Sequence, residues 1–432
     1  MTRTSRTSET STIVIAGAGQ SGSHTAASLR EFGFKGRIVL VGDEPFLPYQ
    51  RPPLSKGHLT GASARESLWL HPGSFYEQHG IELLLAETVS SIDRTNCRVQ
   101  LRGGAWLAYD HLVLALGAHN RALPVAGTEL DGVVGLRNLA EADDIRDRLD
   151  RARHVVVLGG GFIGLEVAAT ATRLGLDAVV IEISDRLMGR VLSPQMAGFL
   201  LDAHRSRGLG IELGTSVAGL TGAAGRVSAV TTTEGREFPA DMVLVGIGAV
   251  PNTDLAEDAG LRIDNGIVVD EYLATDDDRI SAVGDCTSCP NRYAGGLRVR
   301  LESVHNATAQ ARVLAARLVG RPEPYDSVPW FWSDQADLKL QIAGLSTQPG
   351  RAVLRGDPAS GRFSVFCFQN DVLRSVESLN RPGDHMAARK LLALGDCLTP
   401  EQANDLNFDL RAHITASTGE PEVREHRAPA PG

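Results

Sequence analysis

The chain has 432 residues and a formal net charge of −9, since 52 Asp and Glu outnumber 43 Lys and Arg. This acidic balance gives no support to a nucleic-acid partner, and no uninterrupted apolar run is long enough to span a bilayer. The length predicts about three domains, and the five scattered cysteines argue against a disulfide framework.

The first structural signal is a glycine-rich turn between two apolar runs. Residues 13–16 predict a buried strand, the motif Gly17-x-Gly19-x-x-Gly22 follows, and a helical segment comes next. A second apolar run ends at Asp43. In a dinucleotide-binding unit these glycines allow a tight turn, close approach of a pyrophosphate and close helix–strand packing. The N-terminus of the helix then holds the phosphates.

A proline-rich segment, residues 44–56, follows this unit. Four prolines within ten residues exclude a long helix or a central strand, which predicts a stiff surface segment before a short helix. Arg51 and Lys56 stand at the two ends of its Pro-Pro pair. Because the chain has only four lysines among many arginines, Lys56 is a candidate functional residue. A rigid connector is the alternative interpretation.

Short strands are expected next, at residues 81–85, 98–101 and 109–116. The last of them is an apolar run stopped by Gly117, and such an end lies close to where a cofactor would pass. Residues 140–149 have helical spacing and a charged, solvated face.

A second glycine motif repeats the plan of the first. Apolar residues 155–158 precede Gly159-x-Gly161-x-x-Gly164, an Ala-rich helix follows, and another apolar strand ends at Glu182. The Glu182 carboxylate stands where it would accept hydrogen bonds from a ribose diol. It would repel a 2′-phosphate, which favours NADH over NADPH. Two nucleotide sites in one chain predict two cofactors side by side, as a redox enzyme needs.

Beyond Glu182, a helix is expected around residues 193–206, followed by several antiparallel strands that include residues 241–247. A strand at 279–283 ends in a Gly-Asp pair that contains Asp285. Cys286 and Cys289 have the spacing of a redox or half-metal motif. Since the chain has no second such pair, they are interpreted as two incidental thiols, and no metal site is expected.

The last third of the chain begins with a helix predicted over residues 300–318 by its apolar spacing. Three prolines in 321–329 mark a boundary, and alternating runs at 338–342 and 363–368 predict an antiparallel sheet followed by helices.

Both ends of the chain are expected to be disordered tails, residues 1–9 and 419–432, because they are polar and the second is rich in proline. The N-terminal stretch lacks the apolar core of a signal peptide. A soluble, cytoplasmic protein without membrane contact is therefore expected.

Taken together, these segments resemble the FAD-dependent, NADH-dependent ferredoxin reductases of bacterial oxygenase systems. The resemblance extends from about residue 12 to at least residue 379. The stretches that carry it are residues 48–56, 159–166, 248–252, 282–285, 301–306 and 329–335.

The resemblance implies an α/β fold of the glutathione-reductase type with two Rossmann-like dinucleotide-binding domains. An FAD domain, residues 10–118 and 248–326, would be split by an inserted NAD domain, residues 119–247. A C-terminal α+β domain, residues 327–418, would follow.

It also implies a set of cofactor-binding residues. FAD would contact Gly17, Gly19, Ser21, Gly22, Asp43, Arg51, Lys56, Val89, Arg137, Asp285 and Val304. NADH would contact Gly159, Gly161, Ile163, Gly164 and Glu182. A helix start near Val304 and the charge of Lys56 would both stabilise a reduced, anionic flavin.

Three residues are implied to act at the reaction centre, Lys56, Glu166 and Trp332. Glu166 would contact the nicotinamide and could pair with Lys56, although an ordinary solvated helix position is the alternative. Trp330 and Trp332 match an aromatic pair near the flavin, and core packing is equally compatible with them.

The implied activity is hydride transfer from NADH to FAD, followed by two single-electron steps to a 2Fe–2S ferredoxin. That ferredoxin would feed an oxygenase, with a haem monooxygenase expected. The chain lacks the cysteine cluster of such a centre, so the acceptor must be another protein.

Two alternatives stay open. One is an NADH oxidase or a rubredoxin reductase on the same fold, and the other is an NADH-sensing flavoprotein resembling apoptosis-inducing factor. Disulfide reductase chemistry is disfavoured, because no cysteine lies near the helix of the first glycine motif or just behind the second motif, and Cys97 lies far along the chain. Cys286 and Cys289 are the only departure that could revive it.

Overall fold

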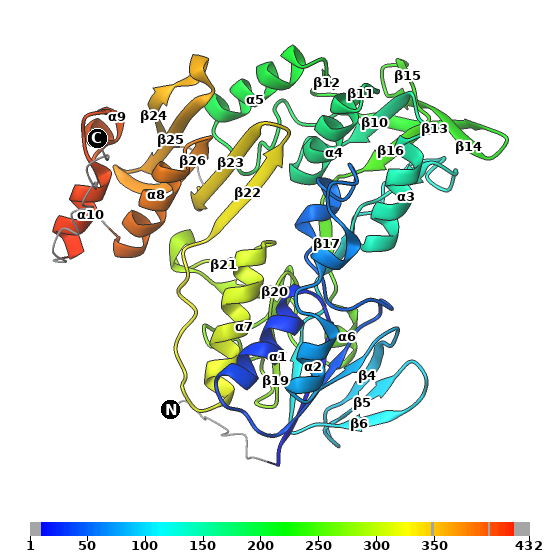
Figure 1. The fold of residues 1–432 in the computed structure, drawn as a ribbon, viewed down its shortest axis with the longest axis vertical. Helices are drawn as coiled ribbons and strands as arrows, with labels where there is room; N and C mark the ends of the chain where they lie inside the picture. The colour runs from blue at the N-terminus through cyan, green and yellow to red at the C-terminus, as the bar shows by residue number, and fades with distance from the viewer. Residues whose placement is uncertain (1–9, 347–349, 396–397, 419–432) are drawn as a thin grey trace, which may run out of the picture.

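The computed structural model describes residues 10–346, 350–395 and 398–418, so the two expected disordered tails lie outside the described residues. Three bodies meet at the centre of the molecule (Figure 1). The lower body holds the first glycine motif, the upper right body holds the second, and the C-terminal sheet forms the upper left body.

The lower body is organised around a five-stranded parallel sheet in the order β19-β7-β1-β2-β3. Its strands are β1 Thr12–Ala16, β2 Arg37–Val41, β3 Ile81–Leu84, β7 His111–Leu114 and β19 Ile280–Ala282. Most of their residues are buried, which explains the short apolar runs in the sequence. Because β19 comes long after β7 in the chain, this sheet is assembled from two separate segments.

Helices α1, Gln20–Glu31, and α7, Val304–Leu318, pack against each other in this body. A small antiparallel sheet also belongs to this body. The strands of that sheet are β4 Val89–Asp93, β5 Arg98–Leu101 and β6 Trp106–Ala108.

The upper right body repeats the plan with a parallel sheet in the order β12-β11-β10-β16-β9. Its strands are β9 Val133–Val134, β10 His154–Leu158, β11 Asp177–Ile181, β12 Gly210–Glu212 and β16 Met242–Val245. Its helices are α3 Leu139–Leu149, α4 Phe162–Arg173 and α5 Pro194–Ser206. Beside the sheet lie the antiparallel strands β13 Val217–Ala223, β14 Arg226–Thr232 and β15 Glu237–Pro239.

The prediction that residues 241–247 belong to the antiparallel strands was wrong. Strand β16 pairs in parallel with β10 and β9 in the centre of the sheet. Its first three residues are buried, as in a strand covered on both faces. An apolar run of this length does not reveal its partner or its direction.

Two chain crossings connect the lower and the upper right bodies. Strand β8, Ala118–Asn120, leaves the lower body, and β17, Ala249–Pro251, returns beside it in antiparallel pairing. The two crossings therefore form a short ribbon between the parallel sheets.

The C-terminal body is a five-stranded antiparallel sheet followed by helices, as predicted. Its order is β22-β23-β26-β25-β24. The strands are β22 Trp330–Gln335, β23 Leu338–Gly344, β24 Arg351–Asp357, β25 Arg362–Gln369 and β26 Val372–Leu379. The helices are α8 Pro382–Leu394, α9 Pro400–Asn404 and α10 Leu410–Thr418.

The proline-rich segment differs from its prediction. The Pro-Pro pair itself starts a 3-10 helix, η1 Pro52–Ser55. Proline suits the first positions of a helix because it lacks the backbone N–H that would have no partner there. The smaller elements of the structure are η2 Arg65–Leu68, α2 Gly73–Gln78, α6 Asp254–Asp258, β18 Ile267–Val268, β20 Thr287–Pro290, η3 Arg292–Ala294, β21 Arg298–Val299 and η4 Pro358–Ser360.

Helix α7 starts later than the predicted residue 300. Ser303 caps it, since the Ser303 hydroxyl accepts a hydrogen bond from the Asn306 amide at 3.0 Å. Among the described residues, no helix is long and apolar enough to cross a membrane.

Candidate functional site

In the first glycine turn, two of the three glycines pack against the backbone and the third faces open space. Gly17 has φ +109°, and a Cβ there would lie 2.2 Å from the Ala115 carbonyl oxygen. A Cβ on Gly22 would lie 1.9 Å from the Gly17 carbonyl oxygen. At Gly19, which caps α1, a Cβ would meet no atom within 4 Å. Gly17 and Gly22 are therefore needed for packing, whereas Gly19 leaves room for a ligand at the helix N-terminus.

The second turn has the same geometry. Gly159 has φ +104°, with the Gly246 carbonyl oxygen 2.5 Å from a Cβ placed on it. A Cβ on Gly164 would lie 2.2 Å from the Gly159 carbonyl oxygen, while Gly161 faces open space. Ile163, on the first turn of α4, has 41% of its surface exposed. Both turns thus leave the helix N-terminus accessible.

An acidic residue follows the second strand of each unit. Asp43 comes after β2 and is exposed. Glu182 comes after β11, where its carboxylate accepts hydrogen bonds from the Gly160 amide at 2.6 Å and the Ser184 amide at 2.8 Å. The second carboxylate is therefore fixed beside the glycine turn, as the sequence pattern predicts.

Lys56 and Glu166 form an ion pair between the two units, with Nζ 2.8 Å from Oε2. The Glu166 side chain is only 2% exposed, so it is not an ordinary solvated helix residue. Two hydroxyls also donate to this carboxylate, Ser55 to Oε2 and Ser333 to Oε1, the latter at 2.7 Å. Glu166 therefore receives three donors from two other parts of the chain.

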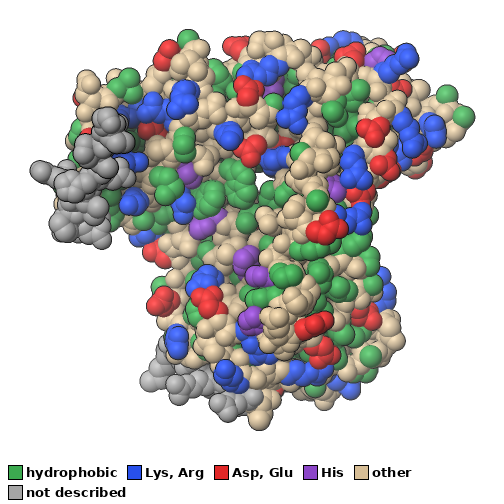
Figure 2. Space-filling view, viewed as in Figure 1, with side chains coloured by type: hydrophobic (Ala, Val, Ile, Leu, Met, Phe, Trp, Pro, Cys, Tyr) green, Lys and Arg blue, Asp and Glu red, His purple; other side chains and the backbone are tan. Residues whose placement is uncertain are grey.

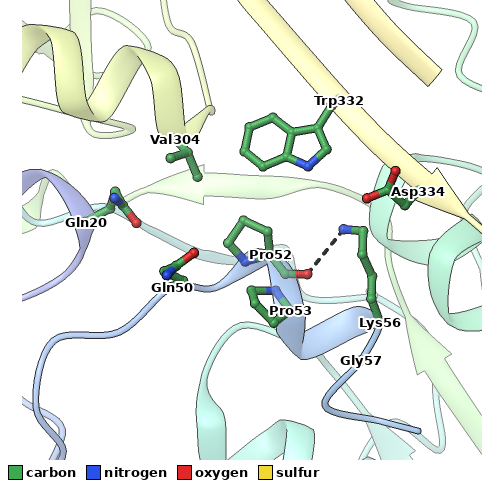
Figure 3. A pocket seen from close by; sticks show the side chains of 9 residues that line it. All are labelled: Gln20, Gln50, Pro52, Pro53, Lys56, Gly57, Val304, Trp332 and Asp334. Atoms are coloured by element: carbon green, nitrogen blue, oxygen red, sulfur yellow. Dashed lines mark hydrogen bonds between the residues drawn. The ribbon is translucent and has the colours of Figure 1, made fainter. Parts of the chain in front are cut away.

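A cavity of about 320 Å³ lies at this junction (Figure 3). It is lined by Gln20, Gln50, Pro52, Pro53, Lys56, Gly57, Val304, Trp332 and Asp334. The Trp332 indole faces the Pro52 ring and Lys56 across the cavity, and Val304 stands at the start of α7. Figure 2 shows this face of the molecule hollowed where the three bodies meet. Lys56, Val304 and Trp332 thus line the same cavity.

A series of charged side chains begins in the proline-rich segment, residues 44–56, that lines the cavity. Arg51 bonds Glu44 at 2.9 Å and donates to the Arg137 carbonyl oxygen. The Arg137 guanidinium lies 3.0 Å from the Asp285 carboxylate. Arg51, Arg137 and Asp285, which the resemblance implies as FAD contacts, are thereby linked. Val89 lies in the hydrophobic core of the lower body and is 7% exposed, and Ser21 is buried in α1.

The two tryptophans play different structural parts. Trp332 lines the cavity, whereas Trp330 packs behind it with a ring-centroid separation of 5.3 Å. The His305 ring lies tilted against Trp330 with its centroid 5.3 Å away, and the Arg389 guanidinium lies 4.8 Å above the Trp330 ring. Burial lowers the pKa of His305 to about 4, so this imidazole is neutral at pH 7.

Both cysteines of the pair are buried. Burial raises the pKa of Cys286 to about 11 and that of Cys289 to about 12. Both thiols therefore stay protonated at neutral pH and are poor nucleophiles, which agrees with their interpretation as incidental thiols. Within the described ranges, no group of three or more His, Cys, Asp or Glu could hold a metal ion.

Several site residues had no signal in the sequence. Ser55 and Ser333 complete the shell of Glu166, while Gln20, Gln50 and Asp334 line the cavity. Gln20 directly follows Gly19, the second glycine of the first motif, so its position at the start of α1 is the one signal that the sequence offered. The others are brought to the site by contacts between distant segments.

Two parallel sheets that each present a glycine turn at a helix N-terminus, with an ion pair between them, define an oxidoreductase that binds two nucleotides. The chain belongs to the pyridine nucleotide-disulphide oxidoreductase family, whose model matches residues 11–311. A reductase C-terminal model matches residues 330–414. FAD and NAD(H) are the cofactors used in this family.

The chain is also similar to individual ferredoxin reductases. Rhodocoxin reductase of Rhodococcus erythropolis is 52% identical over 402 residues, which cover 93% of this chain and 94% of that protein. The ferredoxin reductase for the CYP199A2 system from Rhodopseudomonas palustris superposes with a TM-score of 0.92 at 44% identity, covering 94% of this chain and all of that one. The covalent putidaredoxin reductase–putidaredoxin complex gives a TM-score of 0.92 at 39% identity, covering 95% of this chain and 99% of that one. The resemblance and the fold class expected from the motifs are confirmed.

The residues present fit both cofactors. Gly19 and Gly161 leave open space at two helix N-termini, where a pyrophosphate would find free amides. The buried Gln20 Oε1, on the cavity wall, has no hydrogen-bond partner among the described residues. A buried polar atom without a partner is rare, so this oxygen favours a bound polar ligand.

Proposed function

We propose that the protein is a ferredoxin reductase that passes electrons from NADH through FAD to a 2Fe–2S ferredoxin, which feeds an oxygenase such as a haem monooxygenase. The observation that carries the proposal is the shared cavity, where Lys56 from the first unit, Glu166 from the second and Trp332 from the C-terminal sheet converge. Relatives over nearly the whole chain are named as reductases of rhodocoxin and putidaredoxin, which supports a protein as the electron acceptor.

Each body would have its own task. Residues 10–118 and 248–326 would bind FAD, residues 119–247 would bind NADH, and residues 327–418 would close the cavity. On the FAD side, Gly17, Gly19, Ser21 and Gly22 would surround the pyrophosphate and Asp43 the ribose. On the NADH side, Gly159, Gly161, Ile163 and Gly164 would do the same, with Glu182 on the ribose. Arg51, Val89, Arg137 and Asp285 would make the further FAD contacts.

Bound FAD supplies the chemistry that takes a hydride from NADH and gives up single electrons. Lys56 keeps a fixed positive charge at the cavity wall, where negative charge accumulates on reduction. The N-terminus of α7 at Val304 adds the positive end of a helix dipole. Glu166 holds the Lys56 ammonium in place, and the Trp332 indole excludes water from one side. No proton donor or acceptor is required from the chain, since positioning and electrostatics suffice.

An anaerobic titration tests the proposal. The purified yellow protein is titrated with NADH and, separately, with NADPH while the flavin absorbance is followed. Candidate ferredoxins are then added in a cytochrome c assay. We expect bleaching by NADH at much lower concentration than by NADPH, and cytochrome c reduction that depends on the ferredoxin. A colourless protein, or one indifferent to NADH, contradicts the proposal.

The same experiment separates the alternatives. If air is admitted after the reduction, rapid reoxidation without an added protein would indicate an NADH oxidase. A response to rubredoxin alone would indicate a rubredoxin reductase. Slow turnover with a long-lived charge-transfer band would indicate an NADH sensor. We also propose a cytoplasmic location, where NADH is available, and fractionation of cells that express the protein would test it.

A further inference from the structure

Strand β22 of the C-terminal sheet presents two different faces to the centre of the molecule. Successive side chains of a strand point to opposite sides. Trp332 and Asp334 line the cavity with Lys56, while Ser333 and Gln335 are both 0% exposed. The second face is directed at helices α4 and α5, where Ser333 and Gln335 bond residues of those helices. A single strand therefore contributes to the cavity and to the shell behind it.

Four buried side chains form a continuous hydrogen-bonded chain behind the cavity. The Ser333 hydroxyl donates to Glu166 Oε1 at 2.7 Å, and Gln335 Nε2 donates to Ser333 Oγ at 3.1 Å. Gln335 Oε1 lies 2.7 Å from His204 Nε2. Glu166 and His204 are 3% and 1% exposed, so water does not compete for these bonds.

The chain of bonds fixes the direction of the Ser333 hydroxyl. Gln335 Oε1 can only accept a hydrogen bond, so the His204 imidazole, whose pKa is lowered by burial, donates to it through Nε2. The Gln335 amide then turns its NH₂ group to Ser333 Oγ. Because Ser333 Oγ already accepts that bond, its own hydrogen points to Glu166.

We infer that Ser333 is a positioning residue for the reaction centre, supported by Gln335 and His204. Ser333 fixes the Glu166 carboxylate, which in turn holds the Lys56 ammonium. The same hydrogen bond anchors strand β22 and so fixes the position of the adjacent Trp332 in the cavity wall. A residue of the C-terminal sheet thus sets the geometry between the two nucleotide units. This inference rests on the proposed function, in which Lys56 stands beside the flavin.

The experiment compares Ser333→Ala, Ser333→Thr and wild-type protein, all loaded with FAD. Flavin reduction by NADH is followed by anaerobic stopped flow, and the flavin midpoint potential is measured by photoreduction against a reference dye. For Ser333→Ala we expect the limiting rate of reduction to fall about tenfold, because a buried charged group loses one donor. The half-saturating NADH concentration should change less than about twofold, since Ser333 bonds Glu166 and none of the glycine-turn residues proposed to hold NADH.

The midpoint potential should become more negative in Ser333→Ala, because a loosened Lys56 stabilises the reduced flavin less. Ser333→Thr keeps the hydroxyl and should restore both the rate and the potential. The matched control is Ser364→Ala, which removes another buried hydroxyl of this sheet that donates to a carboxylate, that of Asp384, at 2.9 Å. It should leave rate and potential unchanged.

The inference fails if Ser333→Ala keeps the wild-type rate and potential, or if Ser333→Thr or Ser364→Ala shows the same losses. If Ser333→Ala does not fold, Gln335→Met is used instead, and it must shift both readouts in the same direction. Failure of the proposed function is distinguishable, because it appears already as a wild-type protein that NADH does not reduce.

Discussion

The Lys56 ammonium lies 2.8 Å from the Glu166 carboxylate although 110 residues separate the two in the chain. A buried ion pair is weak evidence for stability, because the cost of removing two charges from water offsets much of their attraction. This pair also borders the cavity through Lys56. The pair is therefore better explained by the electrostatics of this cavity than by the stability of the fold.

The first prediction concerns the charge of Lys56. Lys56→Met should slow flavin reduction by NADH at least about tenfold, because the fixed charge beside the flavin is lost. It should also lower the free energy of unfolding by about 3–5 kcal/mol, since Glu166 stays buried without its partner. Stopped flow and urea unfolding measure the two effects.

Two further variants separate these effects. Adding Glu166→Gln to Lys56→Met should restore much of the stability but not the rate, because no unpaired charge remains. Lys35→Met, which changes an exposed lysine, is the control and should leave both quantities unchanged. A Lys56→Met protein with the wild-type reduction rate would contradict the role of the charge.

The second prediction separates glycines that face a ligand from glycines that pack. Gly161→Ala adds a methyl group into open space, so the fold should keep its stability. The half-saturating NADH concentration should nevertheless rise about tenfold or more, because the methyl group occupies the approach of the pyrophosphate. Gly164→Ala places its Cβ 2.2 Å from a backbone oxygen and should destabilise the fold itself.

Thermal unfolding and steady-state kinetics check this contrast. The same comparison applies to the first motif: Gly19→Ala should weaken FAD retention, whereas Gly22→Ala should destabilise the fold. Equal stability losses in Gly161→Ala and Gly164→Ala would show that the space next to Gly161 is filled in solution.

The strand–turn–helix units were predictable because their signals are local. Glycine spacing and a four-residue apolar run lie within about 30 residues and are almost independent of the rest of the chain. The partner and direction of a strand are not local. Strand β16 was assigned wrongly because its apolar residues suit a parallel or an antiparallel neighbour equally well.

The shell of Glu166 could not be predicted for the same reason. Ser55 and Ser333 are ordinary serines in the sequence, 111 and 167 residues from Glu166. Only the packing of η1, α4 and β22 brings the three side chains together. The family motifs gave Lys56, Glu166 and Trp332, whereas the hydroxyls between them required the structure.

The third prediction concerns coenzyme choice. Glu182→Gln should raise kcat/KM for NADPH relative to NADH about tenfold, because it removes the repulsion of a 2′-phosphate while an amide oxygen can still accept from Gly160. Glu212→Gln, at the end of the neighbouring parallel strand β12, is the matched control and should not change the ratio. An unchanged ratio in Glu182→Gln would place the discrimination elsewhere.

The last prediction concerns Glu377, which joins the C-terminal sheet to the body that holds the second glycine motif. This residue of β26 is 1% exposed, and its carboxylate accepts hydrogen bonds from the Ser193 amide at 2.7 Å and the Ser193 hydroxyl at 2.6 Å. Ser193 caps helix α5. Burial raises the pKa of Glu377 to about 7, from 4.5, although the bonds from Ser193 oppose the shift.

The sign of the stability effect follows from this raised pKa. Below pH 4.5 the carboxyl is protonated in the folded and the unfolded chain, and its contribution to stability is complete. Between pH 4.5 and about 7 the unfolded chain releases a proton that the folded chain still holds, so the folded state loses stability as the pH rises. The loss is about 3 kcal/mol once the pH exceeds the folded pKa.

Glu377→Gln cannot ionise and should lack this loss while keeping an acceptor for the Ser193 amide. The difference in free energy of unfolding, variant minus wild type, should therefore rise by about 3 kcal/mol between pH 4.5 and pH 8. Urea unfolding across this range measures it. Glu66→Gln, at an exposed position, is the control and should show a flat difference. A flat difference for Glu377→Gln as well would mean that the carboxyl is solvated in the folded protein, because only its burial separates the two ionisation states in energy.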